Sequence, residues 1–310
     1  AVDVCCCNVV ISCRMVDAKE ALVAMRVFLL CLLTMVLSKT LVFALDFNST
    51  KSRRVMVVAG AGGDEEYTSI FSEWADVLAK AFQDNSAELV NITNKPENTD
   101  ARKIIEDKLK KWALAKEDEI WILLVGHGTF DGKQAKFNLV GDDISDLDFQ
   151  RWLKPHQGPL VFINTSSSSA PFIRTLSGPN RVVATATKSG FEQNFCRFGG
   201  YLSAAFEQKT ADLDKDGGVS VLEAFLIASR KVEEYYLEND RLLSENALLD
   251  DNGDGRGTPA SWFRGVRVER NLQGKNIADG NISRLIFPII PLTEQAISPE
   301  LRNKRSKVEA

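Results

Sequence analysis

The chain has 310 residues, of which 45% are hydrophobic and 26% are charged, and its formal net charge is −4 at pH 7. This length and apolar content suffice for one large domain or two small ones. A mildly acidic chain lacks the basic footprint of a nucleic-acid-binding protein, so we expect no nucleic-acid partner.

The first 44 residues differ in character from the rest of the chain. Met25 and Arg26 open an apolar run of about a dozen residues that leads to small residues before Ala44, the pattern of a secretory signal peptide. A membrane span needs about 20 apolar residues, so this run is short for one. The alternative is a leader that is not cleaved, and we expect the chain to contact a membrane only through such an anchor. We predict residues 1–24 to lie upstream of the true start, Met25–Ala44 to be a leader, and the mature protein to be secreted or periplasmic.

The next segment begins an alternation of strand and helix patterns. Residues 53–60 are a short apolar run that ends in glycine, which predicts a buried strand. Apolar side chains then recur at helical spacing over 66–82, and a second strand is predicted at 87–93. Asn98 and Thr99 offer the N-cap of another helix.

The alternation continues to about residue 190. Residues 119–128 are nearly continuous in apolar side chains, as parallel strands covered on both faces are. Ser145 and Asp148 form a capping box for the next helix, and two more apolar runs follow at 158–164 and 181–187. The pattern predicts a three-layer α/β fold with a mostly parallel sheet and helices on both faces. Ligands of such a sheet bind beyond the carboxyl ends of the strands.

Two of these strands end in residues suited to chemistry. His127 lies between two glycines after the third strand, whereas His156 lies in a loop and is expected to be solvated. The fourth strand ends in Asn164 and Thr165, followed by four serines at 166–169. This polar run is either a loop on an unrelated α/β domain or the place where a nucleophile should stand.

The chain resembles the caspase-fold cysteine peptidases, in particular legumain and the catalytic subunit of glycosylphosphatidylinositol transamidase, in VGHGTFDG and GPLVFINTSSSSAPF. Those proteins carry a His-Gly pair after one strand and a cysteine after the next. The resemblance covers roughly residues 53–205. It implies a caspase-like fold in which His127 is the catalytic base, the Gly128 amide contributes to the oxyanion hole, and Ser166 replaces the cysteine.

The same resemblance implies a substrate-binding edge. Asn164 replaces the acidic residue that often stands two positions before the cysteine and helps relatives to recognise basic side chains. ATATKSGF follows the fifth strand, where relatives bind substrate, so Thr187 and Lys188 are expected to contact a peptide.

The replacement of cysteine by serine decides which function we expect. A serine hydroxyl needs a hydrogen-bonded base that has its own orienting partner, and the sequence offers no such partner for His127. We therefore predict a degenerate peptidase that binds a peptide or protein partner. The alternatives are an active hydrolase that uses Ser166 with His127 as base, or a substitute nucleophile at Cys196, for which a structural thiol is the simpler interpretation.

Residues 212–223, DLDKDGGVSVLE, match the EF-hand calcium loop at its diagnostic positions. A helix is expected to follow, and an acidic solvated turn is the alternative. The predicted Ca²⁺ ligands are the oxygens of Asp212, Asp214, Asp216, Gly218 (through its carbonyl), Ser220 and the bidentate Glu223.

A second candidate loop begins at Asp250. Asp250, Asn252 and Asp254 fit positions 1, 3 and 5 of a calcium loop, but Ser261 stands at position 12, so the bidentate carboxylate is missing. A weak calcium site and an Asn/Asp/Gly-rich turn explain this stretch equally well.

These patterns divide the chain into four parts. After the leader we expect a peptidase-like domain at 45–210 and a calcium-binding segment packed on it at 211–265. A C-terminal extension follows at 266–310, with a candidate edge strand at 283–289 and a charged end that suggests truncation.

Overall fold

A computed structural model describes residues 52–84, 86–93, 100–116, 118–269 and 278–292, together with Ile297 and Leu301. All of them belong to one compact unit, Ala44–Ala310. The leader expected at Met25–Ala44 and the cap expected at Asn98 and Thr99 lie outside the described residues. Within the described part of the chain, no helix combines the length and the apolarity needed to cross a membrane.

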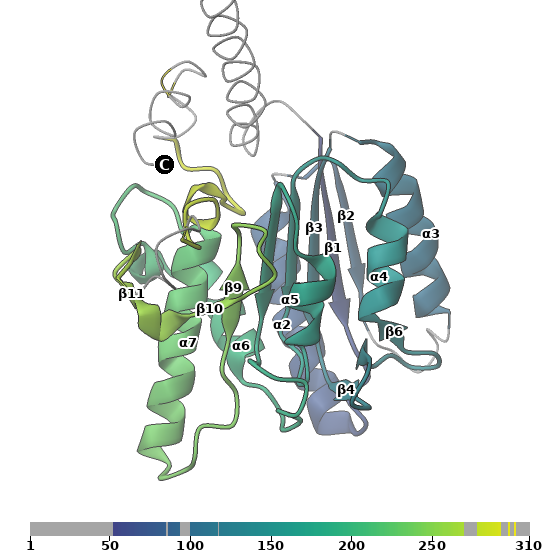
Figure 1. Cartoon of the computed structure of the whole chain (residues 1–310), viewed down its shortest axis with the longest axis horizontal. Helices are drawn as coiled ribbons and strands as arrows, with labels where there is room; N and C mark the ends of the chain where they lie inside the picture. The colour runs from purple at the N-terminus through teal and green to yellow at the C-terminus, as the bar shows by residue number, and fades with distance from the viewer. Residues whose placement is uncertain are drawn as a thin grey trace, which may run out of the picture. The chain divides into compact units, whose positions relative to one another are not determined.

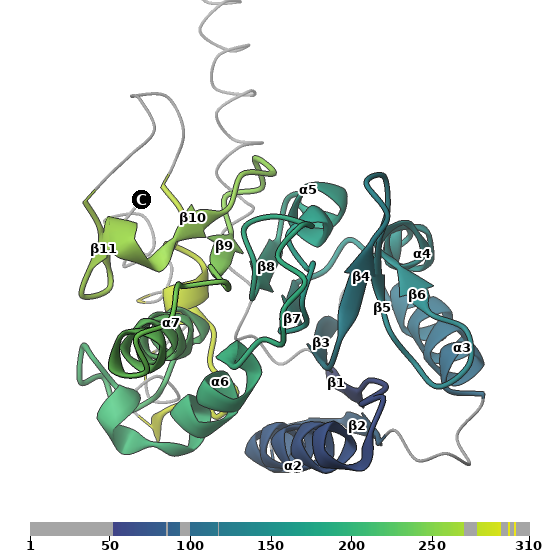
Figure 2. The same ribbon diagram turned by 90° about the horizontal axis from the view of Figure 1, so that it is seen from below.

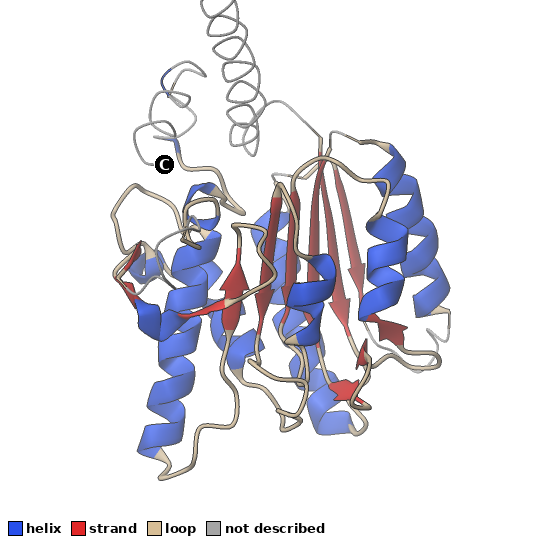
Figure 3. Ribbon diagram, in the orientation of Figure 1, coloured by secondary structure: helices blue, strands red, loops and turns tan. Residues whose placement is uncertain are grey.

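A seven-stranded sheet in the order β10-β9-β8-β7-β3-β1-β2 forms the centre (Figures 1 and 3). Its five parallel strands are β1 (Arg53–Ala59), β2 (Glu88–Ile92), β3 (Glu119–Val125), β7 (Leu160–Asn164) and β8 (Arg181–Thr185). The antiparallel pair β9 (Leu248–Asp250) and β10 (Thr258–Pro259) extends the sheet beyond β8. The five parallel strands lie where the apolar runs predict them.

Helices cover both faces of this sheet, as Figure 2 shows from below. One face carries α2 (Glu65–Phe82), α6 (Phe198–Glu207) and α7 (Val221–Glu238). The other carries α3 (Ala101–Leu114), α4 (Asp146–Leu153) and α5 (Pro171–Leu176). Alternate residues of β1 divide between the two cores: Val55 and Val57 belong to the first, Met56 and Val58 to the second. The predicted three-layer α/β fold is confirmed.

Short elements complete the chain. The strands β4 (Gly128–Phe130), β5 (Ala135–Phe137) and β6 (Ile144–Ser145) form a small antiparallel sheet, and β11 (Phe263–Arg264) pairs with β12 (Arg267–Val268). Single 3-10 turns lie at η1 (Lys209–Ala211), η2 (Ala260–Trp262) and η3 (Ser283–Leu285).

Local capping signals set several helix starts. The capping box predicted at Ser145 and Asp148 is present at the start of α4, and Asp64 caps α2 by accepting from the Tyr67 amide at 2.8 Å. A side-chain oxygen at this position satisfies an amide that has no partner inside the helix.

Two expectations are wrong in the structure. His156 is buried rather than solvated, and its Nε2 lies 3.2 Å from the Pro159 carbonyl oxygen, because the turn after α4 folds back on the start of β7. The candidate edge strand at 283–289 is instead the 3-10 turn η3 followed by a buried segment, since its amides at Ile282 and Ser283 bond to the Asp251 carboxylate.

Candidate functional site

The carboxyl ends of β3 and β7 meet at the predicted peptidase-like site. Leu124 pairs with Asn164 in the parallel register, so the loops that follow the two strands emerge side by side. A Cβ atom on Gly128 would lie 2.3 Å from the Ser167 carbonyl oxygen. Only glycine allows the two loops to approach so closely.

Ser166 is completely buried, and its polar atoms bond within its own loop. The hydroxyl donates to Asn164 Oδ1 at 2.7 Å and also lies 3.1 Å from the Ser167 carbonyl oxygen. The Ser166 amide donates to the same Asn164 Oδ1 at 3.0 Å. Asn164, expected to contact a substrate, is itself fully buried and holds Ser166 in place.

The Gly128 amide, the predicted oxyanion donor, has a partner as well. It donates to Ser167 Oγ at 3.1 Å, and Ser167 Oγ lies 3.0 Å from the Gly128 carbonyl oxygen. Ser167, not Ser166, is therefore the serine bonded to the glycine that follows the histidine.

His127 lies among aromatic rings and is half-buried. Its ring centroid is 5.1 Å from Tyr67, 4.9 Å from Phe71 and 6.2 Å from Phe195, with edge-to-face geometry in each pair. Burial lowers the pKa of His127, and the Gly62 backbone and Asp64 oppose that shift. Burial therefore favours the neutral imidazole, and within the described residues it makes no hydrogen bond to Ser166.

The two residues expected at the substrate-binding edge differ in role. Thr187 is buried, and its Oγ1 accepts from the Ala170 amide at 3.0 Å and lies 3.2 Å from Ser169 Oγ. Lys188 has an exposed side chain, and its amide donates to Glu192 Oε2 at 2.9 Å. Thr187 therefore supports the serine loop, whereas the exposed Lys188 side chain lies 3.9 Å from Glu192 Oε1 in an ion pair.

Cys196 is a buried thiol. Burial raises its pKa well above the usual range, and the carboxylates of Glu245 and Glu192 add to the shift. Because the thiolate is the nucleophilic form, this environment argues against Cys196 as a substitute nucleophile.

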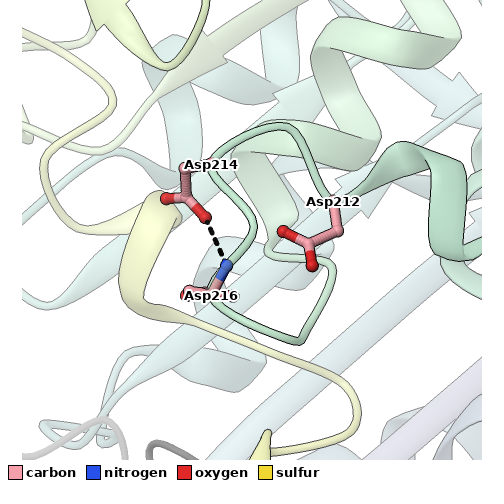
Figure 4. Close-up of side chains that lie close together, drawn as sticks. All are labelled: Asp212, Asp214 and Asp216. Atoms are coloured by element: carbon pink, nitrogen blue, oxygen red, sulfur yellow. Dashed lines mark hydrogen bonds between the residues drawn. The ribbon is translucent and has the colours of Figure 1, made fainter.

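Three aspartates of the first predicted calcium loop lie together between η1 and α7 (Figure 4). Asp212, Asp214 and Asp216 each offer a carboxylate oxygen, and these oxygens lie within 4.8 Å of one another. The Asp216 amide donates to Asp214 Oδ1 at 3.2 Å, and the Gly217 amide donates to Asp212 Oδ2 at 3.1 Å. Asp212 Oδ1 is buried and has no hydrogen-bond partner within the described residues.

Glu223 closes this loop from the first turn of α7. Its Oε1 accepts from the amides of Leu213 and Asp214 at 2.6 and 3.2 Å, and its Oε2 accepts from the Ser220 amide and hydroxyl, both at 2.8 Å. Ser220 caps α7 in return. The predicted bidentate ligand therefore ties the end of the loop to its beginning.

The repulsion among these carboxylates is visible at Asp216. Burial, together with the charges of Asp214, Glu223 and Asp212, raises its pKa to about 6, against the bond from the Gly218 amide. Gly218, whose carbonyl is a predicted ligand, is half-buried beside the aspartates.

The second predicted loop is the turn between β9 and β10. Asp250 is the last residue of β9 and is completely buried, and its Oδ1 accepts from the Gly253 amide at 3.0 Å. Asn252 Oδ1 accepts from the Asp254 amide, and Asp254 Oδ1 accepts from the Arg256 amide, both at 2.8 Å.

The sequence analysis did not single out several buried carboxylates, among them Glu245, Asp251 and Asp279. Glu245 Oε2 accepts from the Arg197 and Phe198 amides at 2.7 and 3.0 Å, and so caps α6 from a distant part of the chain. Each lies in a polar or irregular stretch, and no local periodicity marks its partner.

Comparison with known proteins identifies no family for this chain. No protein-family model matches it, and no curated protein matches it. A crystal structure of a protein from Geobacter sulfurreducens is similar, with a TM-score of 0.42 and 11% sequence identity, over 64% of this chain and 92% of that one. A likeness this weak carries no argument about function, and the caspase-fold resemblance stays a prediction.

Proposed function

We propose that this chain is a degenerate caspase-fold, legumain-like peptidase that binds a peptide or protein partner without cleaving it. The observation that carries the proposal is that the groups needed for acyl transfer already bond to one another. An oxyanion hole requires amides that point at the substrate. Here the Gly128 amide is taken by Ser167 Oγ and the Ser166 amide by Asn164 Oδ1.

The nucleophile and its base support the same conclusion. A serine becomes nucleophilic when a base accepts its proton, whereas the Ser166 hydroxyl donates to an amide oxygen of Asn164. For the alternative, an active serine hydrolase, Ser166 must leave a 2.7 Å hydrogen bond and turn to His127. No carboxylate bonded to the imidazole is present within the described residues to orient it.

The surface around His127 has the composition of a binding site. Tyr67, Trp74 and Phe195 are half-exposed there, and the Arg197 guanidinium lies 5.2 Å from the centre of the Phe195 ring. Aromatic and arginine side chains carry most of the binding energy at protein interfaces. Trp74 is held firmly, because a Cβ atom on Gly200 of α6 would lie 2.5 Å from its ring.

A panel of short fluorogenic peptides, assayed with the wild-type protein and with His127→Ala, separates the two functions. We expect the two proteins to give the same background rate, because no group activates Ser166. We also expect that peptides selected for binding to wild type bind Trp74→Ala at least about thirtyfold more weakly, since truncating an aromatic hot spot costs about 2 kcal/mol or more.

Leu237→Ala is the control for that panel, because Leu237 is 80% exposed near the end of α7. It should bind the selected peptides as wild type does. Peptide cleavage by wild type that disappears in His127→Ala would instead establish the active hydrolase. Equal peptide binding by wild type and Trp74→Ala would remove the His127 surface as the binding site.

We also propose that the loop at 212–223 binds Ca²⁺. The support is the gathering of three aspartate oxygens, the buried Asp212 Oδ1 that has no partner in the described part of the chain, and oxygen-rich positions that suit a hard cation. Export through the leader at Met25–Ala44 belongs to this proposal, because extracellular loops with a dissociation constant of about 10⁻⁴–10⁻³ M are useful only where calcium is abundant.

Calcium binding should weaken as the pH falls through about 6, because protons compete for Asp216. Without calcium, a lower pH should have the opposite effect and favour the folded state. Because the pKa of Asp216 is raised, the folded state holds a proton that the unfolded chain releases. Asp216 therefore stabilises the calcium-free protein at low pH, and this stabilisation is lost as the pH rises through about 6.

Titration calorimetry between pH of about 7.5 and about 5.5 measures the first effect, with proton release detected in buffers of different ionisation enthalpy. Thermal melts of the calcium-free protein from a pH of about 4 to about 7, which brackets the unfolded and folded pKa values of Asp216, measure the second. Calcium affinity that does not change across this range would contradict the assignment of Asp216 as a ligand.

A further inference from the structure

The loop after β9 repeats the hydrogen bonds that positions 3 and 5 accept in the 212–223 loop, whereas its position 1 carboxylate accepts from the position 4 amide and that of the 212–223 loop accepts from the position 6 amide. Asn252 at position 3 accepts from the position 5 amide at 2.8 Å, and Asp254 at position 5 accepts from the position 7 amide at 2.8 Å. The corresponding bonds of the first loop measure 3.2 and 3.0 Å. Positions 4 and 6 of both loops also have positive φ angles, at Lys215 and Gly217 and at Gly253 and Gly255, so the two backbones bend in the same way there.

Asp279 does in the second loop what Glu223 does in the first. Its Oδ1 accepts from the Asp251 and Asn252 amides, positions 2 and 3, at 2.9 and 3.1 Å. Its Oδ2 accepts from the hydroxyl of Thr258, position 9. Glu223 accepts from positions 2, 3 and 9 of its own loop. Asp279 thus stands in the place of the position 12 carboxylate.

The fold explains why this carboxylate comes from another segment. In the first loop α7 begins directly after position 9, and its first turn brings Glu223 back over the loop. After the second loop the chain continues into β10, which pairs with β9, and then into η2. An extended strand carries Ser261 away from the loop, so the closing carboxylate cannot be local.

A separate observation indicates a missing cation. Asp250 at position 1 is completely buried, and its Oδ2 has no hydrogen-bond partner within the described residues. A buried carboxylate oxygen without a partner is costly unless the group is paired or coordinates a metal.

We propose that residues 250–258 form a second calcium site, which Asp279 closes in place of Ser261. The position 1, 3 and 5 side chains of Asp250, Asn252 and Asp254 and the position 7 carbonyl supply the other oxygens, which is the ligand type that Ca²⁺ takes. This second site contains no residue of the first loop, and its calcium binding does not depend on peptide binding.

The site would also fasten the C-terminal segment to the sheet. Asp251 is buried and bonds back to this segment: its Oδ1 accepts from the Gly280 amide at 2.9 Å, and its Oδ2 accepts from the Ser283 amide at 2.8 Å. A few residues on, the Ile286 carbonyl accepts from the Val221 amide at 2.9 Å, at the start of α7. One segment therefore joins the two loops.

Calcium titration of the chelator-stripped full chain tests the site, with bound ions counted by calorimetry and by native mass spectrometry. We expect two ions on wild type and one on Asp279→Asn, which keeps the size of the side chain and removes its charge. Glu223→Gln should also bind one ion, and that ion should be lost in the double variant.

Asp254→Asn provides a second test, because Asp254 is exposed and its change leaves the buried bonds of Asp279 intact. If circular dichroism shows that Asp279→Asn does not fold, a loss of one ion from Asp254→Asn supports the site. An unchanged ion count in a folded Asp279→Asn, or in Asp254→Asn, overturns it. If the second loop binds calcium but the first does not, Glu223→Gln leaves the ion count unchanged while Asp279→Asn still lowers it.

Discussion

We expect Arg53→Met to lower the free energy of unfolding by about 3–5 kcal/mol, because it leaves a buried carboxylate without its partner. Arg53 Nε lies 3.1 Å from Glu119 Oε1 across the β1–β3 pair, and each side chain is only 5% exposed. The same guanidinium donates to the Pro288 carbonyl at 2.8 Å and lies 5.4 Å from the centre of the Trp121 ring. The substitution therefore also releases the C-terminal segment from the sheet.

The pH dependence of the stability of Arg53→Met shows whether the unpaired Glu119 carboxylate causes the loss. Burial raises the pKa of Glu119, and the charge of Arg53 opposes the rise. Without Arg53 the pKa rises further, so the folded variant takes up a proton at a higher pH than wild type. A raised pKa in the folded state favours folding at low pH, and this stabilisation is lost as the pH rises. The defect of Arg53→Met should therefore be largest above neutral pH and shrink as the pH falls.

Urea unfolding of wild type and variant at several pH values measures this difference. The matched control is Arg54→Met, the next residue along β1. Arg54 pairs with Asp118 at 2.7 Å, but both side chains are about one-fifth exposed, and pairs in contact with water contribute about 0–1 kcal/mol. Equal losses in the two variants, or a loss in Arg53→Met that does not vary with pH, would contradict the buried ion pair.

Chelation of calcium should lower the melting temperature by several degrees. The loop at 212–223 gathers Asp212, Asp214, Asp216 and Glu223, which repel one another when no cation is bound. A ligand that binds only the folded state stabilises it by about 2.7 kcal/mol at a hundredfold excess over its dissociation constant. One kcal/mol moves the melting temperature of a domain of this size by about 2–4 °C, so the loss is on the order of 5–10 °C.

Glu223→Gln should abolish most of the calcium response of the first loop. A glutamine side chain keeps the size but replaces one acceptor oxygen by a donor, whereas the two Glu223 oxygens accept from main-chain and hydroxyl groups at both ends of the loop. Calcium, and not magnesium, should restore the melting temperature of wild type, because magnesium requires a smaller octahedral shell.

Differential scanning calorimetry with chelator, calcium and magnesium measures these shifts. Asp84→Asn is the control, because it removes one negative charge from an exposed aspartate after α2. It should respond to calcium as wild type does. A melting curve that excess chelator leaves unchanged in the wild-type protein would show that the loop is only an acidic turn.

Local sequence patterns determine much of this molecule. The apolar runs identify the five parallel strands, because a strand covered on both faces must be apolar at consecutive positions. The Ser145 capping box and the spacing of the aspartates between 212 and 223 are equally local. Such features involve residues only a few positions apart, and they hold in almost any tertiary setting.

The chemistry of the site depends on the tertiary structure. The sequence places His127 and Ser166 after neighbouring strands, but the strand register decides that Gly128 bonds to Ser167, 39 residues away. The aromatic rings around His127 come from α2 and from the segment before α6. No periodicity can specify such partners, because each bond depends on how distant elements are packed.

Asp279 is the clearest example of a residue whose role depends on the tertiary structure. From the sequence, the loop at Asp250 lacks its closing carboxylate, since position 12 is Ser261. In the fold, Asp279 reaches positions 2 and 3 of that loop from 28 and 27 residues downstream. The sequence by itself determines the five parallel strands, the capping box of α4 and the ligand spacing within each loop. Only the packing of the C-terminal segment against β9 decides which carboxylate completes the second loop, because that contact is made across the chain.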